Sequence, residues 1–560
     1  MKNKFWLILF AIVAIGVFFR FYCLGTIPQG FFSDEAAVGY NAYSIIKTGR
    51  DEFGNFLPLF FTSFGEGKLP LYVYQAIPSV LVFGPNEFAV RFPGALFGSL
   101  TILVWFFLLQ ELLFLSQLKK KYHITISLIS CLVLAIMPWH VHFSRGVFGQ
   151  ESVFWIALGS WLILRGLKLK KQRWIFLGFV GLIASLMIYH SPKVILPLWT
   201  PFLLGLYWKR SKEDLIVFSK KVVIGAILLV FVWGLMSFNP MGIRRSQGIS
   251  VFSVHSGVSA ILHESIIEEG HFNRPVWYAR LLHNKVESYG KEIIGRYLSH
   301  FNPDFLFVSG DLLRPRYRVP GVAQAYLIFL PFALIGFYYL LNKRIWLILI
   351  LLALTPLPAS LTFETPSTVR ALIMALPLSA IIGLGFTFSF EWLKSHTNKV
   401  ILSGLLLVFL IACFHQVLYF FNSYFYLAQI HKPYQWQYGY KPLVKKVLRL
   451  QDNYDQVIMT GMGGPPYIFF LFFQLYDPIK FQKEVYQYIG ETDPFGFIHI
   501  TGFDKYRFPK VDCPFDENAR KTLFICKENA EGIDRKFVVD EVYFGDQTPA
   551  FTFVDPEYEK

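Results

Sequence analysis

Eleven apolar stretches constrain this chain more than any other feature, because a helix needs about 20 apolar residues to cross the hydrocarbon core of a bilayer, or somewhat fewer when flanking residues reach the interface. Only 16% of the 560 residues are charged and 54% are hydrophobic, whereas about 25% of an ordinary soluble domain is charged. The sequence therefore predicts an α-helical polytopic membrane protein with about 11 transmembrane helices. The stretches cover residues 5–23, 87–113, 124–139, 152–167, 174–190, 194–208, 222–238, 322–342, 345–361, 371–392 and 400–422.

Lysine and arginine gather in alternate connections between these stretches. Short cytoplasmic loops carry an excess of these residues, so we expect the N-terminus and the basic loops to be cytoplasmic. The loops are marked by Lys119 to Lys121, Lys168 to Arg173, Lys209 to Lys221, Lys343 with Arg344, and Lys394 with Lys399. This topology also accounts for the net charge of +15, and we expect no nucleic-acid partner.

The same orientation places every long loop outside the cytoplasm. It predicts a transmembrane domain over residues 1–422, with outer loops 24–86 and 239–321, and an extracytoplasmic C-terminal domain over residues 423–560. The tail predicts a small α/β domain. Its expected helices are 441–450 and 465–475, and its expected strands begin near residues 454, 496, 521 and 537. Cys513 and Cys526 are close enough in sequence to form a disulfide, and the sequence leaves that pairing open.

The first outer loop holds the residues best suited to chemistry. Asp34 and Glu35 follow Phe31 and Phe32 at the start of an expected surface helix, where the helix dipole favours negative charge. Lys68 lies between flexible glycines and Pro70. A lysine on an outer face that should carry few cations needs a partner, and its ammonium suits phosphate.

Farther along, Glu87 and Arg91 are four residues apart at the start of the second apolar stretch. This spacing places both side chains on one helix face. We expect a structural ion pair between them.

These residues form ordered motifs: Asp34-Glu35, Gly49 to Gly54, Lys68 to Tyr72, and Asn86 to Pro93. In this order they resemble the membrane glycosyltransferases that use polyprenyl-phosphate sugars, namely the protein O-mannosyltransferases and lipid A aminoarabinose transferases, which have the GT-C fold. The resemblance implies inverting transfer to an extracytoplasmic acceptor, which is a protein hydroxyl, a glycolipid or a cell-envelope glycan.

The resemblance also implies roles for individual residues. Asp34 is the expected catalytic base with Glu35 beside it. The expected substrate- and phosphate-binding residues are Lys68, Tyr72, Arg145, Glu151, His190 and Arg370. The implied partners are a polyprenyl-phosphate-sugar donor, the acceptor and membrane lipids. The lysine-rich composition, with two cysteines in the tail, indicates the cytoplasmic membrane of a bacterium or archaeon.

A metal ion is left open. Asp34, Glu35, Glu66, His140, His142 and Glu151 are the residues that could gather around a divalent cation. No cofactor is otherwise expected.

The sequence leaves two alternative functions open. A transporter or flippase of a lipid-linked sugar would predict inverted repeats and charges within the spans, which the sequence does not show convincingly. An outer-face binding or assembly protein would leave Asp34, Lys68 and Arg145 without a role. The sequence leaves the sugar, the prenyl carrier and the acceptor undetermined.

Overall fold

The computed structural model describes most of the chain and divides it into two compact units. The helical unit comprises residues 1–20, 96–144 and 148–420, and the mixed unit comprises residues 21–95, 145–147 and 421–560. The mixed unit thus combines the first outer loop with the C-terminal tail, two segments that the sequence placed in different domains. The described residues are 2–116, 118–211, 220–240, 243, 248–253, 257–431, 433–492, 498–528 and 532–558. Residues 212–219 of one expected cytoplasmic loop lie outside them.

Helices occupy all eleven apolar stretches. Among the described residues, α4, α10, α19 and the segment Leu372–His396 are long and apolar enough to cross a membrane by themselves, so the number of spans stays a prediction. The helices at these stretches are α1 (Lys2–Phe21), α4 (Glu87–Phe114), α5 (His123–Ile136), α7 (Glu151–Lys168), α8 (Gln172–Leu186), α9 (Ser191–Ser211), α10 (Lys220–Ser237), α15 (Leu330–Asn342), α16 (Trp346–Leu354) with α17 (Leu357–Ser360), α18 (Ala375–His396) and α19 (Lys399–Phe425).

Glycines set the closest helix packing in the helical unit. A Cβ added to Gly178 of α8 would lie 2.7 Å from the carbonyl oxygen of Gly159 in α7, and one on Gly336 of α15 would lie 1.8 Å from the carbonyl oxygen of Ile381 in α18. Small residues at such crossings let helix backbones approach, as is typical of membrane bundles. In contrast, Val400 and Val408 of α19 are exposed, as lipid-facing side chains would be.

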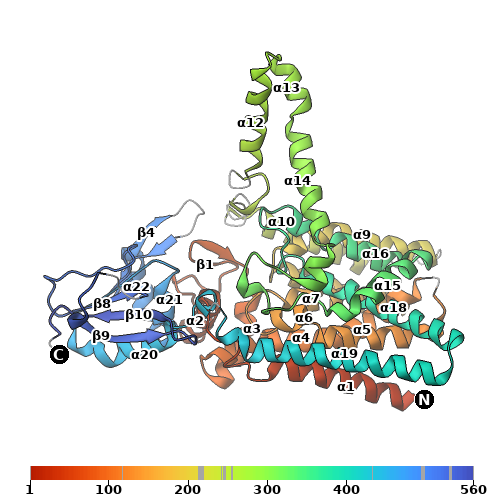
Figure 1. Ribbon diagram of the computed structural model, residues 1–560, viewed down its shortest axis with the longest axis horizontal. Helices are drawn as coiled ribbons and strands as arrows, with labels where there is room; N and C mark the ends of the chain where they lie inside the picture. Colours follow the sequence, from red (N-terminus) through yellow and green to blue (C-terminus); the bar gives the residue numbers. More distant parts are fainter. Residues whose placement is uncertain are drawn as a thin grey trace. The chain divides into compact units, whose positions relative to one another are not determined.

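The second outer loop contains a helical hairpin. Helices α12 (Val258–His271) and α14 (Lys285–Ser299), joined through α13 (Val276–Leu282), run side by side and project from the rest of the helical unit (Figure 1). The segment after α14 is held to the turn before α18. His300 Nε2 accepts from the backbone N–H of Ser367, and Asp311 accepts from the Thr368 hydroxyl at 2.9 Å.

The mixed unit is built on a six-stranded mixed sheet with strand order β6-β7-β3-β8-β10-β9. The central strand β3 is parallel to β7 and β8, whereas β10 is antiparallel to both β8 and β9. The strands are β3 (Gln456–Met459), β6 (Gly502–Phe503), β7 (Tyr506–Arg507), β8 (Thr522–Lys527), β9 (Val538–Tyr543) and β10 (Pro549–Val554). Cys513 forms a disulfide with Cys526 of β8.

Most elements expected in the tail are confirmed. The two helices are α20 (Tyr440–Leu450) and α21 (Pro466–Phe473), and three of the strands are β3, β8 and β9. Of the strand expected from residue 496, the structure describes β5 (Ile498–Ile500), which pairs with β4 (Ile489–Thr492) in a separate two-stranded sheet. Residues 493–497 lie outside the described part of the chain. Strand β10 was not anticipated.

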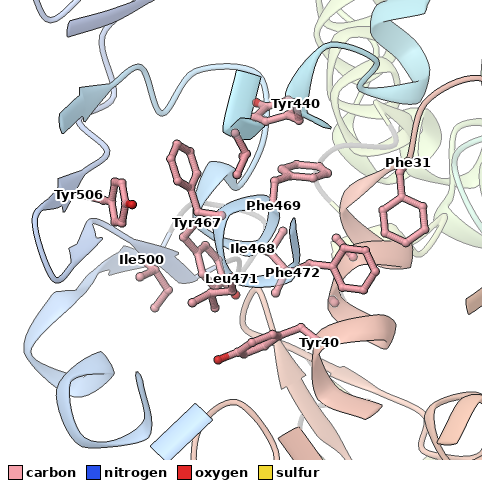
Figure 2. Packing of buried hydrophobic residues seen from close by; sticks show 14 of the residues in the cluster. Phe31, Tyr40, Tyr440, Tyr467, Ile468, Phe469, Leu471, Phe472, Ile500 and Tyr506 are labelled. Carbon is pink, nitrogen blue, oxygen red and sulfur yellow. The ribbon is translucent and has the colours of Figure 1, made fainter. Parts of the chain in front are cut away.

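Helix α21 lies at the centre of the mixed unit's core. Its residues Pro466 to Phe472 are all buried, as is typical of a helix that is hydrophobic on every side. Figure 2 shows Tyr467, Ile468, Phe469 and Leu471 projecting from it in different directions. Phe472 stacks on Phe31 with ring centroids 4.9 Å apart, so the tail and the first outer loop share one core.

A buried carboxyl group lies in the same core. Glu52 accepts hydrogen bonds from the side chains of Asn41 (3.1 Å) and Ser63 (2.9 Å), and its other oxygen accepts from the Tyr467 hydroxyl at 3.4 Å. Burial disfavours the charged form and raises the pKa of Glu52 from 4.5 to about 7, although the Asn41 and Ser63 hydrogen bonds oppose the shift.

This pKa predicts a pH-dependent stability. The folded state holds the Glu52 proton more tightly than the unfolded state does, so the contribution of Glu52 to stability is greatest below pH 4.5 and falls until the pH passes about 7. The expected loss is about 3 kcal/mol in the free energy of unfolding. Glu52→Gln should remove this part of the pH dependence in thermal unfolding measurements between pH 4 and 8. Both proteins should be similarly stable at pH 4, and an unchanged slope in the variant would contradict the assignment.

Candidate functional site in the mixed unit

Helix α2 (Ser33–Thr48) presents the first candidate residues. Its N-terminus is capped by Glu35, whose carboxylate accepts from the backbone N–H of Phe32 at 3.3 Å. Its C-terminus ends at Gly49, which adopts the left-handed conformation (φ 69°) and donates its N–H to the Ile45 carbonyl. A glycine is favoured there because it meets no Cβ penalty. The Gly49 to Gly54 motif therefore begins as a helix stop.

Glu35 is fully buried and forms a bidentate ion pair with Arg91 of α4. Arg91 Nε and Nη2 donate to the two carboxylate oxygens at 2.8 and 2.9 Å. The remaining guanidinium donors reach the carbonyls of Leu24, Pro28 and Gly30. All five N–H groups of Arg91 thus have partners, as a buried cation requires. The structure places Glu35 where it holds α2 against the segment after α1.

Asp34, the neighbouring residue, is accessible to solvent. Its side chain is 47% exposed, and its Oδ1 accepts a 2.5 Å hydrogen bond from Lys68 Nζ. Lys68 belongs to β2 (Glu66–Lys68), which pairs with β1 (Phe61–Ser63). The ammonium also lies 4.3 Å from the centre of the Phe64 ring, a distance at which a cation–π contact is favourable. The structure brings the expected base and the expected phosphate ligand into direct contact.

Tyr72 and Arg145 both donate hydrogen bonds to backbone carbonyls of the mixed unit. Tyr72, on α3 (Leu71–Phe83), is buried and donates its hydroxyl to the Val90 carbonyl at 3.1 Å. Arg145 is also buried, donates to the carbonyls of Tyr22 and Ile27 at 2.7 and 2.8 Å, and lies over the ring of Phe425. Both residues fix neighbouring segments in this structure.

The ion pair expected between Glu87 and Arg91 does not form. Arg91 turns inward to Glu35, whereas Glu87 pairs with Lys441 of α20. Helical spacing alone favoured the local pair, but the buried guanidinium gains a bidentate carboxylate, which is the stronger geometry.

The helical unit carries the other three candidates. Glu151 begins α7 and is fully buried, and its two carboxylate oxygens have no hydrogen-bond partner among the described residues. His190 lies just before α9 and Arg370 before α18. Ser191, next to His190, donates its hydroxyl to the Arg370 carbonyl at 2.8 Å, so these two candidates lie on neighbouring turns.

Arg370 has a partner that the sequence did not suggest. Its guanidinium donates to the backbone carbonyl of Glu364 at 3.2 Å and to its carboxylate at 3.4 Å, and Arg314 pairs with the same carboxylate. Glu364 therefore offsets part of the positive charge in this turn.

In the mixed unit, the sequence did not suggest a role for Gln437. Its Oε1 accepts from the backbone N–H of Ser33 at 2.7 Å. It is distant in sequence and carries no motif.

The side chains that could bind a metal ion do not form a cluster in the described structure. Nowhere in the described ranges do three His, Cys, Asp or Glu side chains come together as a metal site would require. Glu35 is occupied by Arg91. In the helical unit His140 contacts Arg20 and Gln150, and His142 contacts the Arg316 carbonyl.

Comparison with known proteins gives no match by sequence. No protein-family model matches the chain, and no curated protein does. The information therefore comes from similarity of structure.

Solved structures of ArnT from Cupriavidus metallidurans are similar to the whole chain. The apo form matches with a TM-score of 0.53 and 10% sequence identity, covering 100% of each chain. The form bound to undecaprenyl phosphate matches with a TM-score of 0.54 and 11% identity, covering 98% of each. At such identities the likeness shows the fold, so the chain has the GT-C fold of the family that its motifs resemble. With its apolar helices, this fold makes it an integral membrane protein.

The oligosaccharyltransferase from Archaeoglobus fulgidus, tethered with an acceptor peptide, also matches. The TM-score is 0.48 at 12% identity, over 84% of this chain. The present chain spans 63% of the length of that protein.

The buried Glu35–Arg91 pair and the partly exposed Glu87–Lys441 pair should differ in how much they contribute to stability. Glu35→Gln leaves the Arg91 charge buried without a carboxylate, and we expect a loss of about 3–5 kcal/mol in unfolding free energy. Glu87→Gln, the matched control, disrupts a pair in which Lys441 is 44% exposed, and should cost less than about 1 kcal/mol. Thermal unfolding of the purified variants measures both. A stable Glu35→Gln protein without activity would instead support a catalytic role for Glu35.

Proposed function

We propose that this protein is an inverting glycosyltransferase that moves a sugar from a polyprenyl-phosphate donor to an extracytoplasmic acceptor. The observation that carries the proposal is the Asp34–Lys68 pair, a solvent-accessible carboxylate joined to an ammonium, on the fold of a protein solved with undecaprenyl phosphate. Inverting displacement requires a base near the acceptor and a cation near the departing phosphate.

In the proposed reaction, Asp34 accepts the proton of the acceptor hydroxyl while that oxygen attacks the anomeric carbon of the sugar. The bond from this carbon to the phosphate oxygen breaks, and polyprenyl phosphate departs with the electron pair. Lys68 stabilises its negative charge. Phosphate is a good leaving group, so the mechanism needs no protonated carboxyl group of the kind that a glycosidase uses.

Asp34 suits the role of base better than Glu35. Both oxygens of Glu35 accept from Arg91 within the core, whereas the Asp34 side chain is half exposed. We assign Glu35 and Tyr72 to positioning α2 and α3. Arg145, Glu151, His190 and Arg370 are proposed to contribute to substrate binding, and substitution of each tests this.

The proposed orientation places the N-terminus in the cytoplasm and the mixed unit outside. The alternation of basic loops supports this orientation. So does the Cys513–Cys526 disulfide, because disulfides persist in oxidising compartments. We propose the cytoplasmic membrane of a bacterium or archaeon as the location.

The direct test is transfer of radiolabelled sugar from polyprenyl-phosphate donors to envelope acceptors by the purified protein. Asp34→Asn should lower kcat by about 10²–10⁴-fold, the usual contribution of a general base. Lys68→Ala should lower kcat/KM by about 10²–10³-fold, as expected when one transition-state charge partner is lost.

A second aspartate–lysine pair in the mixed unit provides matched controls. Asp504 and Lys480 lie 3.3 Å apart and are 40% and 61% exposed. Asp504→Asn and Lys480→Ala should retain transfer activity. If the donor lipid is never consumed but lipid-linked sugar crosses the bilayer of proteoliposomes, the protein is a transporter and the proposal is wrong.

A further inference from the structure

A groove of about 610 Å³ lies wholly within the mixed unit. It is formed where β8 ends and β10 begins, together with the turn between β9 and β10 and the segment 433–440. None of the candidate residues that the sequence predicted lines it, although Gln437 does. The groove therefore needs its own explanation.

Five aromatic rings line this groove: Tyr434, Tyr438, Tyr440, Phe544 and Phe551. Tyr434 is 53% exposed. The rings of Tyr438 and Phe544 lie 6.5 Å apart with their planes tilted by 37°. Within the described chain, no hydrogen bond engages the hydroxyl of Tyr434 or Tyr438. The groove thus offers apolar ring faces together with two phenolic groups that can donate or accept.

Polar side chains of both charges also line the groove. Asp546 Oδ1 accepts from the Thr548 backbone N–H at 3.0 Å and from its hydroxyl at 2.6 Å. This fixes the carboxylate and leaves Oδ2 without a bond to any other described residue. Lys527 pairs with Glu528 at 3.2 Å. The rim therefore supplies fixed donors and acceptors without a surplus of positive charge.

Gln437 connects the groove to the N-terminus of α2. Its side chain lines the groove, and its Oε1 accepts from the backbone N–H of Ser33, the residue before Asp34. Gly464 makes room for this amide, because a Cβ there would lie 2.5 Å from Gln437 Nε2. Gln437 therefore links the lining of the groove to the helix that carries the proposed base.

We propose that this groove binds a saccharide, and that the saccharide is the glycan portion of the acceptor. A sugar ring has an apolar C–H face that stacks on aromatic rings, and its hydroxyls pair with carboxylate, amide and phenol groups. A nucleic acid would require excess positive charge, which the Lys527–Glu528 pair and Asp546 do not provide. The acceptor assignment rests on the function proposed above, whereas saccharide binding does not.

Direct binding to the full-length protein tests the proposal. The protein is placed in nanodiscs free of sugar-based detergent. Linear trisaccharides of glucose, mannose, N-acetylglucosamine and a uronic acid are used as probes, with affinity measured by calorimetry and contact by saturation-transfer NMR. At least one should bind, and both Tyr434→Ala and Phe544→Ala should weaken its affinity about tenfold, as loss of an aromatic anchor does.

Tyr543→Ala is the matched control. Tyr543 is 45% exposed on β9 but does not line the groove, so its substitution should leave affinity unchanged. Phe544 also packs against the core, and the more exposed Tyr434 therefore provides the variant least prone to misfolding. The proposal is overturned if no trisaccharide binds, if affinity is unchanged in both groove variants, or if the groove instead binds an unstructured peptide in a Tyr434-dependent way.

The two proposals can fail separately. Asp34→Asn should still bind the saccharide, because Asp34 does not line the groove. Saccharide binding without any Asp34-dependent transfer would overturn the proposed function but keep the groove. Asp34-dependent transfer without saccharide binding would overturn the groove alone.

Discussion

The buried ion pair between Glu35 and Arg91 fixes the region on which the proposed chemistry depends. The five N–H groups of Arg91 donate to one carboxylate and three backbone carbonyls. A charge that is buried so completely tolerates few other arrangements, because any lost partner leaves an uncompensated donor in the core. Helix α2 is therefore held in one place at the start of α4, and Asp34 is held with it.

Adjacent positions on a helix point in different directions, and this separates the roles of Asp34 and Glu35. Successive side chains are about 100° apart around the axis, so when Glu35 faces the core Asp34 is directed elsewhere. It meets Lys68 on a strand whose ammonium is also supported by Phe64. One carboxylate stabilises the fold, and its neighbour remains accessible for a reaction.

The mixed unit shows how a short apolar helix can join distant parts of a chain. Helix α21 is buried on every side, and its residue Phe472 stacks on Phe31 of the first outer loop. The first outer loop therefore packs on the same core as the C-terminal sheet, and Gln437 reaches Ser33 from the tail. The tail therefore contacts the first outer loop by packing and the start of α2 by a hydrogen bond.

Much of the local structure followed from the sequence, since hydropathy and turn residues are local signals. Helices form at all eleven apolar stretches, and α20, α21, β3, β8 and β9 lie where patterning predicted them. The ordered motifs indicated the fold, and the structure brings Asp34 and Lys68, two residues of these motifs, into contact. Strand β10 escaped prediction because its hydrogen-bonding partners, rather than its alternation, define it.

The sequence by itself thus determined the membrane class and the helices, and it supplied the residues to which the proposed function assigns the chemistry. Only the tertiary structure decided which of two adjacent carboxylates is buried, that Arg91 pairs with Glu35 rather than with Glu87, and that Glu364 accompanies Arg370. These outcomes depend on which charged groups share a low-dielectric interior. Charged residues that are distant in sequence compete for these partners, so their spacing along the chain does not predict the outcome.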